Sequence, residues 1–291
     1  MIGDFKNKPG LNLDPGVGPG TQIIDRSSGS RRYGIDAADY ALRMERVNAY
    51  QRALAMTDWT LFAPLDYRRW TGRATHFRDA ERSAKVAGDG DPLGLVDPLV
   101  GEPLVQPVSA ERPVWTEEGA VFDAGPYLDI PVSTYPNNEL SFPLTFLMDL
   151  DHTHQSEENE IFLIDHRNST GSGRVGVTIQ DTSGRDAIAV FYRNDGESMT
   201  RHSVLMEEID AGFSGQVAVA FGTDEVRLYM DGILVDVFET ESIVELTLQN
   251  VTIGTRADAN VGFLDGRIRF AAIAPTALTD TQIAHISDLL L

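Results

Sequence analysis

The chain has 291 residues, of which 42% are hydrophobic and 23% charged, and its formal net charge is −20. This length suits one large domain or two modest ones, and the composition is ordinary for a protein with a real hydrophobic core. The absence of cysteine excludes disulfides, thiolate metal sites and cysteine catalysis. Apolar runs stay well short of the roughly 18 residues of a membrane span. The N-terminus also lacks the apolar segment of a signal peptide, so we expect neither membrane insertion nor a cleaved leader.

Charge is distributed unevenly along the chain. Residues 1–87 carry 14 Lys and Arg against 10 Asp and Glu, whereas residues 88–291 carry 10 against 34. An asymmetry of this size indicates two regions with different neighbours, although an acidic surface that serves only solubility is the alternative. Because the acidic region would repel nucleic acid and anionic surfaces, we expect no nucleic-acid partner.

The first third of the chain has the pattern of an arm followed by a helix. Residues 1–34 are rich in Gly, Pro and Ser without periodicity, so we predict an extended arm that a neighbouring subunit orders. From Asp36, a candidate N-cap, to Met56, apolar residues recur at helical spacing. This amphipathic helix packs either on its own chain or against partner chains. Its candidate assembly residues are Tyr40, Met44, Val47 and Leu54.

We assign residues 35–87 to a helical anchoring region and residues 88–112 to a connector. Residues 57–87 hold two of the three Trp among several arginines, a composition found both in protein interfaces and in small satellite cores. In the connector, Pro and Gly recur every few residues, which predicts a succession of turns. We therefore place the domain boundary there.

From Trp115 onward, short β-rich segments alternate with clusters of turn residues, a pattern typical of an all-β sandwich. Between Val226 and Phe238, apolar residues alternate on both sides of Asp231-Gly232. This dipeptide predicts a type I′ hairpin turn because both of its positions accept positive φ. Near the C-terminus, Thr279 is a candidate cap for a short helix that ends the chain.

The order of these C-terminal segments resembles that of concanavalin A-like, laminin-G-type domains. The resemblance is carried by VAVAF, VRLYMDGILV with its Y-x-D-G hairpin, LTLQNVTIGT with its I-G strand end, and FLDGRIRFAAIAPTALTDTQIAHI with its closing L-T-x-x-x-I turn. Upstream, AVFDAGPYLDIP resembles the opening strand of the family. The resemblance covers about Val105 to Leu290 and implies a mainly β fold, a jelly-roll sandwich that we assign to residues 113–291.

The lead-in LVGEPLVQPVSAERPVW resembles the segment before such domains in bacteriophage structural proteins. It implies a fibre, spike or decoration subunit in the virion of a phage or phage-like particle. Residues 1–87 would then bind other virion proteins, the chain would form a homo-oligomer, and the sandwich would project outward to adhere to host-surface glycans. Two alternatives stay open: a free-standing bacterial carbohydrate-binding module and a laminarinase-like glycoside hydrolase.

A hydrolase of this fold needs two carboxylates held across the scissile bond. Glu158 and Glu160 can share a strand face, but Asn159 stands between them and no third acid follows at the family's spacing. We therefore expect no enzymatic activity and assign no catalytic residue.

A glycan site would use aromatic faces and amide groups at one rim of the sandwich. The candidates are Trp115, Tyr135, Tyr192 and Asn194, with ordinary packing as the alternative. The resemblance also implies a Ca²⁺ ion at a sandwich edge, where carboxylates and carbonyls would supply oxygen ligands. The locally dense candidates are Asp149, Asp151, Glu158 and Asp165, although dense acids are also expected by chance in so acidic a chain.

His152 and His154, two residues apart, would face one side of a strand and could hold a transition metal. Their polar neighbours favour a solvated loop instead.

Overall fold

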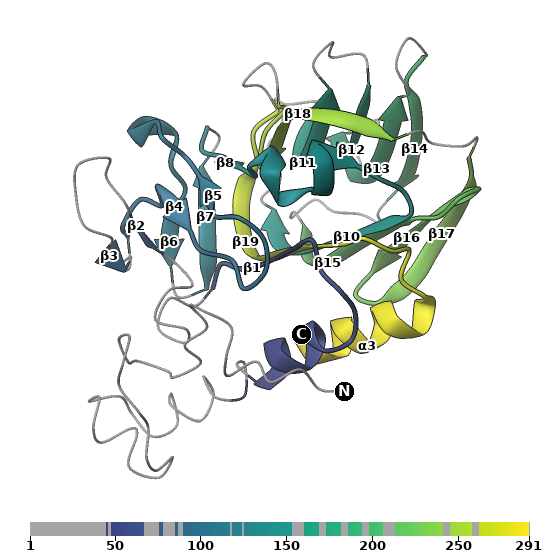
Figure 1. Cartoon of the computed structure of the whole chain (residues 1–291), viewed down its shortest axis with the longest axis horizontal. Helices are drawn as coiled ribbons and strands as arrows, with labels where there is room; N and C mark the ends of the chain where they lie inside the picture. Colours follow the sequence, from purple (N-terminus) through teal and green to yellow (C-terminus); the bar gives the residue numbers. More distant parts are fainter. Residues whose placement is uncertain are drawn as a thin grey trace.

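Two antiparallel β-sheets face each other in the computed structural model, with the main hydrophobic core between them (Figure 1). The structure describes residues 45, 48–66, 76–77, 85–86, 90–116, 118–123, 125–152, 160–168, 173–181, 186–193, 198–205, 213–240, 245–257 and 262–290. The predicted β-sandwich is confirmed.

Sheet A has the strand order β17-β16-β15-β10-β19-β7-β6, and β1 pairs with β19 beside β7. Its strands are β1 (Leu61–Pro64), β6 (Val114–Thr116), β7 (Gly119–Asp123), β10 (Leu144–His152), β15 (Phe213–Phe221), β16 (Glu225–Met230), β17 (Ile233–Glu239) and β19 (Asp265–Ala274).

Sheet B has the order β14-β13-β12-β11-β18-β8-β5-β4-β2-β3, and β9 pairs with β18. Its strands are β2 (His76–Phe77), β3 (Lys85–Val86), β4 (Leu95–Val96), β5 (Leu104–Val105), β8 (Leu128–Asp129), β9 (Glu139–Leu140), β11 (Glu160–Asn168), β12 (Arg174–Asp181), β13 (Asp186–Arg193), β14 (Thr200–Leu205) and β18 (Leu246–Ile253).

Sheet A is apolar on both of its faces. On β10, Phe146 and Met148 point into the main core, whereas Leu147 between them belongs to a second core on the outer face, the face turned away from sheet B. Successive side chains of a strand point to opposite faces, so an unbroken apolar run predicts burial on both sides. The second core therefore needs a covering layer beyond the sheet.

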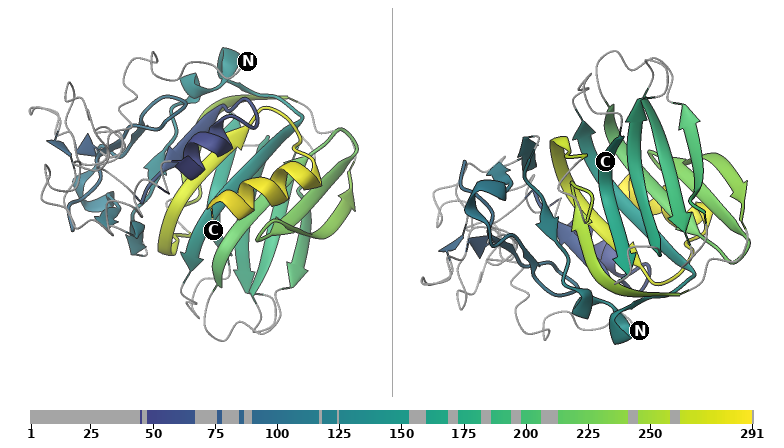
Figure 2. Two further views of the ribbon diagram at one scale, coloured as in Figure 1. Left: turned by 90° about the horizontal axis from the view of Figure 1, so that it is seen from below. Right: turned by 90° about the horizontal axis from the view of Figure 1, so that it is seen from above.

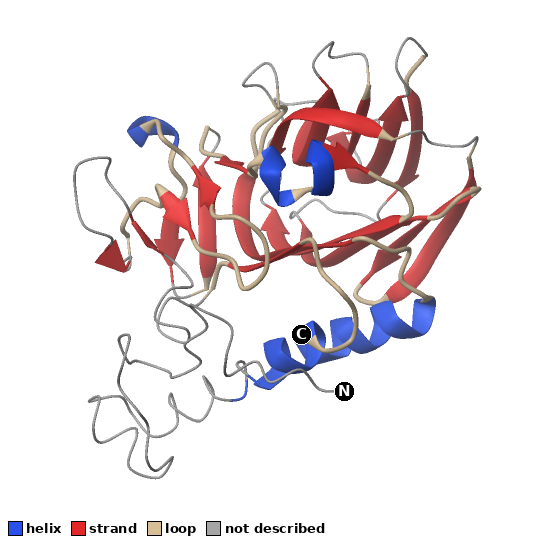
Figure 3. Ribbon diagram, viewed as in Figure 1, coloured by secondary structure: helices blue, strands red, loops and turns tan. Residues whose placement is uncertain are grey.

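Two helices supply that layer, and Figure 2 (left) shows both lying over sheet A. The first comprises residues 48–54, and the second is α3 (Asp280–Leu290), which ends the described chain (Figure 3). Buried Tyr50 and Ala53 from the first helix and Ile283 and Ile286 from α3 share the second core. Among the described helices, none has both the length and the apolar character needed to cross a membrane.

The N-terminal helix packs on its own chain along the part that the structure describes. Leu54 is buried in the second core, and Trp59 donates a hydrogen bond from Nε1 to the Ala53 carbonyl at 3.3 Å. The sequence left open whether this helix packs on its own chain or against partner chains. Leu54 packs on its own chain. The other candidate assembly residues, Tyr40, Met44 and Val47, lie outside the described residues.

The predicted hairpin and helix cap are both confirmed. Asp231 and Gly232 have φ values of 48° and 78°, as a type I′ turn requires, and they join β16 to β17. At α3, the Gln282 backbone N–H donates to Thr279 Oγ1, while Gln282 Oε1 accepts from the Thr279 N–H at 3.0 Å. This reciprocal pair is a capping box, which satisfies two otherwise unpaired donors at the start of the helix.

A buried polar pair sits within the main core. The Tyr135 hydroxyl lies 2.6 Å from His166 Nε2, and the His166 ring stacks on Phe146 with centroids 4.9 Å apart. Burial lowers the pKa of His166 to about 3 and raises that of the Tyr135 hydroxyl, so both groups are neutral at pH 7. The pair thus lies in the core without a charge.

Acid should destabilise the sandwich through His166. The unfolded chain binds a proton at this residue below about pH 6.5, whereas the folded chain does so only near pH 3. Stability is therefore lost as the pH falls between these values, by about 2 kcal/mol from this group alone at pH 5. Urea unfolding at pH 7 and pH 5 measures the loss. The variant His166→Gln should show a smaller loss, and an equal loss in both proteins would contradict the assignment.

Candidate functional site

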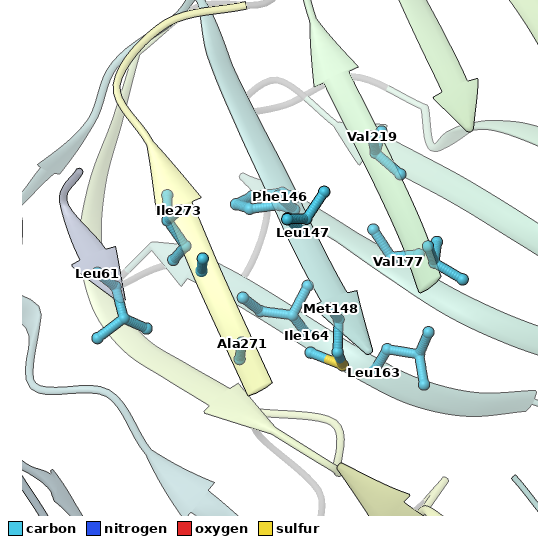
Figure 4. Close-up of a pocket in the computed structure, with 12 residues that line it drawn as sticks. Leu61, Phe146, Leu147, Met148, Leu163, Ile164, Val177, Val219, Ala271 and Ile273 are labelled. Carbon is cyan, nitrogen blue, oxygen red and sulfur yellow. The ribbon is translucent and has the colours of Figure 1, made fainter. Parts of the chain in front are cut away.

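The two sheets differ in how open their outer faces are. Helices cover the outer face of sheet A, whereas no described helix lies over β11–β14 on the outer face of sheet B (Figure 2, right). Between the sheets lies a cavity of about 20 Å³, lined by apolar residues such as Phe146, Leu163 and Val219 (Figure 4). A space of that size holds about one water molecule, so it is not a ligand site. The outer face of sheet B is therefore the candidate binding surface.

Small side chains occupy the middle of this face. Strand β12 contributes Gly176 and Thr178, which lie opposite Phe191 and Ala189 on β13. Ala187 on β13 also points outward. Gly176 is required by packing, because a Cβ atom there would stand 2.5 Å from Cζ of Phe191. The short side chains leave room for longer ones to reach across from the flanking strands.

A polar triad of Glu160, Gln180 and Arg201 makes use of this room. Glu160 Oε1 accepts from Gln180 Nε2 at 3.1 Å and from Arg201 Nη2 at 2.5 Å. Since Glu160 is on β11 and Arg201 on β14, the ion pair spans β12 and β13. Its carboxylate and guanidinium side chains stay 27% and 39% exposed, so both can meet a ligand from solvent.

On the same face of sheet B, Asp165 and Arg174 form a buried, bidentate ion pair. Arg174 Nε and Nη2 each donate to an Asp165 carboxylate oxygen at 2.8 Å, and the Ala257 N–H adds a bond of 2.9 Å. The guanidinium also lies 4.7 Å from the ring centroids of Phe162 and Phe191. Burial raises the pKa of Asp165, while the hydrogen bonds and charge of Arg174 oppose that rise. The pair fixes the two rings beneath a charged surface.

Arg174 is also the centre of a row of arginines. It pairs in register with Arg167 on β11 and with Arg193 on β13, and all three side chains belong to the outer face. Burial lowers the pKa of Arg167, and the charges of Arg174, Arg256 and Arg193 lower it further. We call Arg167, Arg174 and Arg193 the arginine row.

The aromatic residues suggested by the sequence lie elsewhere. Trp115, Tyr135 and Tyr192 are buried in the main core, where Tyr135 bonds to His166 and Tyr192 stacks on His202. Their rings therefore offer no face on which a sugar could stack. Asn194 lies outside the described residues.

The three suggested calcium ligands that the structure describes are not brought together. Asp149 and Asp151 on β10 are both ion-paired with Arg269, whereas Asp165 is on the opposite sheet with Arg174. Glu158 lies outside the described residues, among which no group of three His, Asp or Glu side chains could hold a metal.

The suggested histidine pair is likewise not assembled in the described residues. His152 is buried, and its Nδ1 lies 3.0 Å from the Asp265 carbonyl oxygen. His154 lies outside the described residues.

Sequence reasoning missed both the triad and the arginine row. The available signal was that Arg167 and Arg174 flank the turn-rich segment NSTGSG, so a β11–β12 hairpin would pair them. Arg193, at the end of the next strand, extends the same register. From the sequence, Glu160 is a candidate only for catalysis, because its partners Gln180 and Arg201 lie 20 and 41 residues further along the chain.

A laminin-G-type family model, described as the concanavalin A-like lectin/glucanases superfamily, matches residues 122–284, more than half of the chain. The chain belongs to this superfamily. The strand series noted in the sequence is thus confirmed as a superfamily domain. The matched residues include the triad and all three members of the arginine row. No curated protein matches the sequence.

Solved structures with a similar fold come from several sources. The CBM40 module of Ruminococcus gnavus IT-sialidase, bound to α2,3 sialyllactose, has a TM-score of 0.43 at 16% identity and covers 50% of this chain and 84% of its own. A heptameric pentraxin from Limulus polyphemus has a TM-score of 0.40 at 16% identity, with coverages of 50% and 69%. The binding domain of botulinum neurotoxin serotype D has a TM-score of 0.43 at 14% sequence identity. The match covers 58% of this chain and 42% of that domain's chain.

The two ion pairs of this face should differ sharply in their effect on stability. Asp165→Asn leaves the Arg174 charge buried without its counter-ion and should lower the free energy of unfolding by roughly 3 kcal/mol or more. Glu160→Gln, the matched control in a more exposed pair, should lower it by less than about 1 kcal/mol. Chemical denaturation checks both variants. Equal losses would refute the distinction.

Proposed function

We propose that the chain is a non-enzymatic glycan-binding adhesion subunit, and that its ligand binds the outer face of sheet B. The triad is the observation that carries this proposal. It gathers a carboxylate, an amide and a guanidinium from three strands on a face that no described helix covers. Partly exposed Glu160 and Arg201 supply an acceptor and donors for sugar hydroxyls, and buried Gln180 holds the Glu160 carboxylate in place. Membership of a superfamily named for lectins supports the same reading.

The described carboxylates favour binding over hydrolysis. Glu160 accepts hydrogen bonds from Arg201 and Gln180, and Asp165 is held in two bonds by buried Arg174. A general acid must instead carry a proton near neutral pH, and a second carboxylate must flank the scissile bond. Both carboxylates are occupied as acceptors of arginine N–H groups, so neither is placed to give a proton to a leaving group.

We further propose that the chain is a fibre, spike or decoration subunit in the virion of a phage or phage-like particle. The lead-in sequence before the sandwich supports this assignment, and the charge split supports different neighbours for the two regions. Residues 1–87 would contact other virion proteins and further copies of the chain, leaving the open face of sheet B for host glycans. A free-standing carbohydrate-binding module is the rival, and it would be monomeric.

Glycan binding can be tested on an array with the intact chain. We expect the wild type to bind a defined set of glycans, and Gln180→Ala and Arg201→Ala to weaken that binding at least tenfold. Arg52→Ala, which changes an exposed arginine on the helix over the opposite sheet, is the matched control and should bind normally. A wild-type chain that binds no glycan would overturn the proposal.

Assembly through the arm can be tested by light scattering. The intact chain should be oligomeric, and removal of residues 1–34 should yield a monomer whose thermal unfolding is unchanged, because the described helix 48–54 is retained. An intact chain that is monomeric would favour the free-standing module.

A further inference from the structure

Strand β17, at one edge of sheet A, carries most of the exposed large apolar side chains (Figure 1). Six large hydrophobic residues are exposed in the part of the chain that the structure describes, and four of them lie on this strand: Ile233, Leu234, Val235 and Val237. Ile233 is 71% exposed. Edge strands pair readily with another chain, and proteins commonly protect them with Lys or Pro. Strand β17 contains neither.

Both hydrophobic cores extend to this edge. Leu234 lies opposite Tyr229, which belongs to the second core. Ile233 lies opposite Met230, which packs against the main core. A further strand beside β17 would therefore extend the two cores at once and remove the exposed apolar side chains from water, which is favourable.

A bulge in β17 limits the length of such pairing. Val235 has no cross-strand partner on β16, so the regular part of β17 runs from Asp236 to Glu239. In this part, the Val237 N–H donates to the Asp236 carboxylate at 2.8 Å in an exposed contact. A carbonyl group of an added strand can replace that carboxylate. The edge therefore suits a short segment of about four residues, bound mainly through its backbone.

The charges at this edge favour a basic partner. Residues 231–244 contain four acids and no Lys or Arg. Arg227, the cation opposite Val237 on β16, is already held by Glu225 at 3.3 Å and by Asp280 at 2.7 Å. A segment that carries arginine would be attracted to this edge, whereas the acidic β17 of a second copy would be repelled.

The N-terminal arm of the chain contains a segment with the required chemistry. Thr21, Ile23 and Ile24 are β-branched residues, which favour strands. Residues 21–32 hold three Arg and one Asp, so their net charge is +2. Between Ile24 and the described helix 48–54, the chain is long enough to span up to roughly 75 Å when extended. That reach is sufficient to cross to a neighbouring copy.

We propose that β17 is the docking edge for residues 21–26 of a neighbouring copy, which add to sheet A as one further strand; this rests on the proposed assembly of the chain through its arm. Successive side chains of a strand point to opposite faces, so Ile23 and Ile24 would each extend one of the two cores. Arg26 would meet the acids of the edge. Backbone hydrogen bonds supply the affinity, and the two isoleucines supply the specificity.

The test measures the mass of the intact chain by light scattering over a range of concentrations. Val235→Lys and Val237→Lys place a charge on the docking edge, and each should raise the dissociation constant of the oligomer by roughly tenfold or more. The arm variant Ile23→Asp with Ile24→Asp should do the same. Val114→Lys, the matched control, changes an exposed valine on β6 at the opposite end of sheet A and should leave the mass unchanged.

Hydrogen–deuterium exchange supplies a second readout on the same proteins. Peptides that cover β17 should exchange more slowly in the wild type than in the arm variant, because docking protects the backbone of the edge. Thermal melting of each variant shows whether it folds.

The outcomes separate this inference from the proposal on which it rests. An oligomer that the β17 variants leave intact would overturn the docking edge without affecting assembly through the arm. An oligomer that the β17 variants dissociate, but the arm variant does not, would overturn the choice of residues 21–26. A monomeric wild type would overturn both proposals, and slow exchange at β17 in that monomer would show that the edge is covered by its own chain.

Discussion

The structure depends on what each sheet can leave open to solvent. Sheet A is apolar on both faces, so its outer face must be covered, and helix 48–54 and α3 provide the cover. Exposing that second core to water would forfeit on the order of 25 cal/mol for each Å² of apolar surface. The C-terminal helix is therefore part of the sandwich rather than an appendage. Its capping box at Thr279 and Gln282 starts the helix where Tyr229 and Arg227 bond to Asp280. The outer face of sheet B is the face that the proposed binding function uses.

Sheet B differs from sheet A because charged side chains lie on its outer face. Buried ionic groups are tolerated only where each has its partners, and Asp165 receives three hydrogen bonds. Gly176 leaves space for Phe191, and the Phe162 and Phe191 rings lie edge to face below the Arg174 guanidinium. The same small residues allow Arg201 to reach Glu160 across two strands. Structural support and the candidate binding surface thus come from one set of contacts.

Local patterns predicted much of the fold. The alternation of apolar and polar residues, the Asp231-Gly232 pair and the Thr279 cap each depend on only a few neighbouring residues. They can therefore be recognised in the sequence, and each appears in the structure. The site was not legible, because it depends on register between distant strands. Trp115 and Tyr192 look like surface aromatics at strand ends, yet the alternation of β6 and β13 turns them into the core, and Tyr135 reaches the same core from the turns of residues 132–138. Glu160 and Arg201 are 41 residues apart, and only the order of β11 to β14 joins them.

The central claim is that ligands reach the sandwich on the outer face of sheet B. Hydrogen–deuterium exchange of the chain, with and without a glycan identified on the array, tests this claim most directly. The account predicts added protection in β11–β14, centred on peptides that contain Gln180, Arg193 and Arg201, with helix α3 and β15–β17 unchanged. Protection confined to α3, the described N-terminal helix or the strands of sheet A would contradict it.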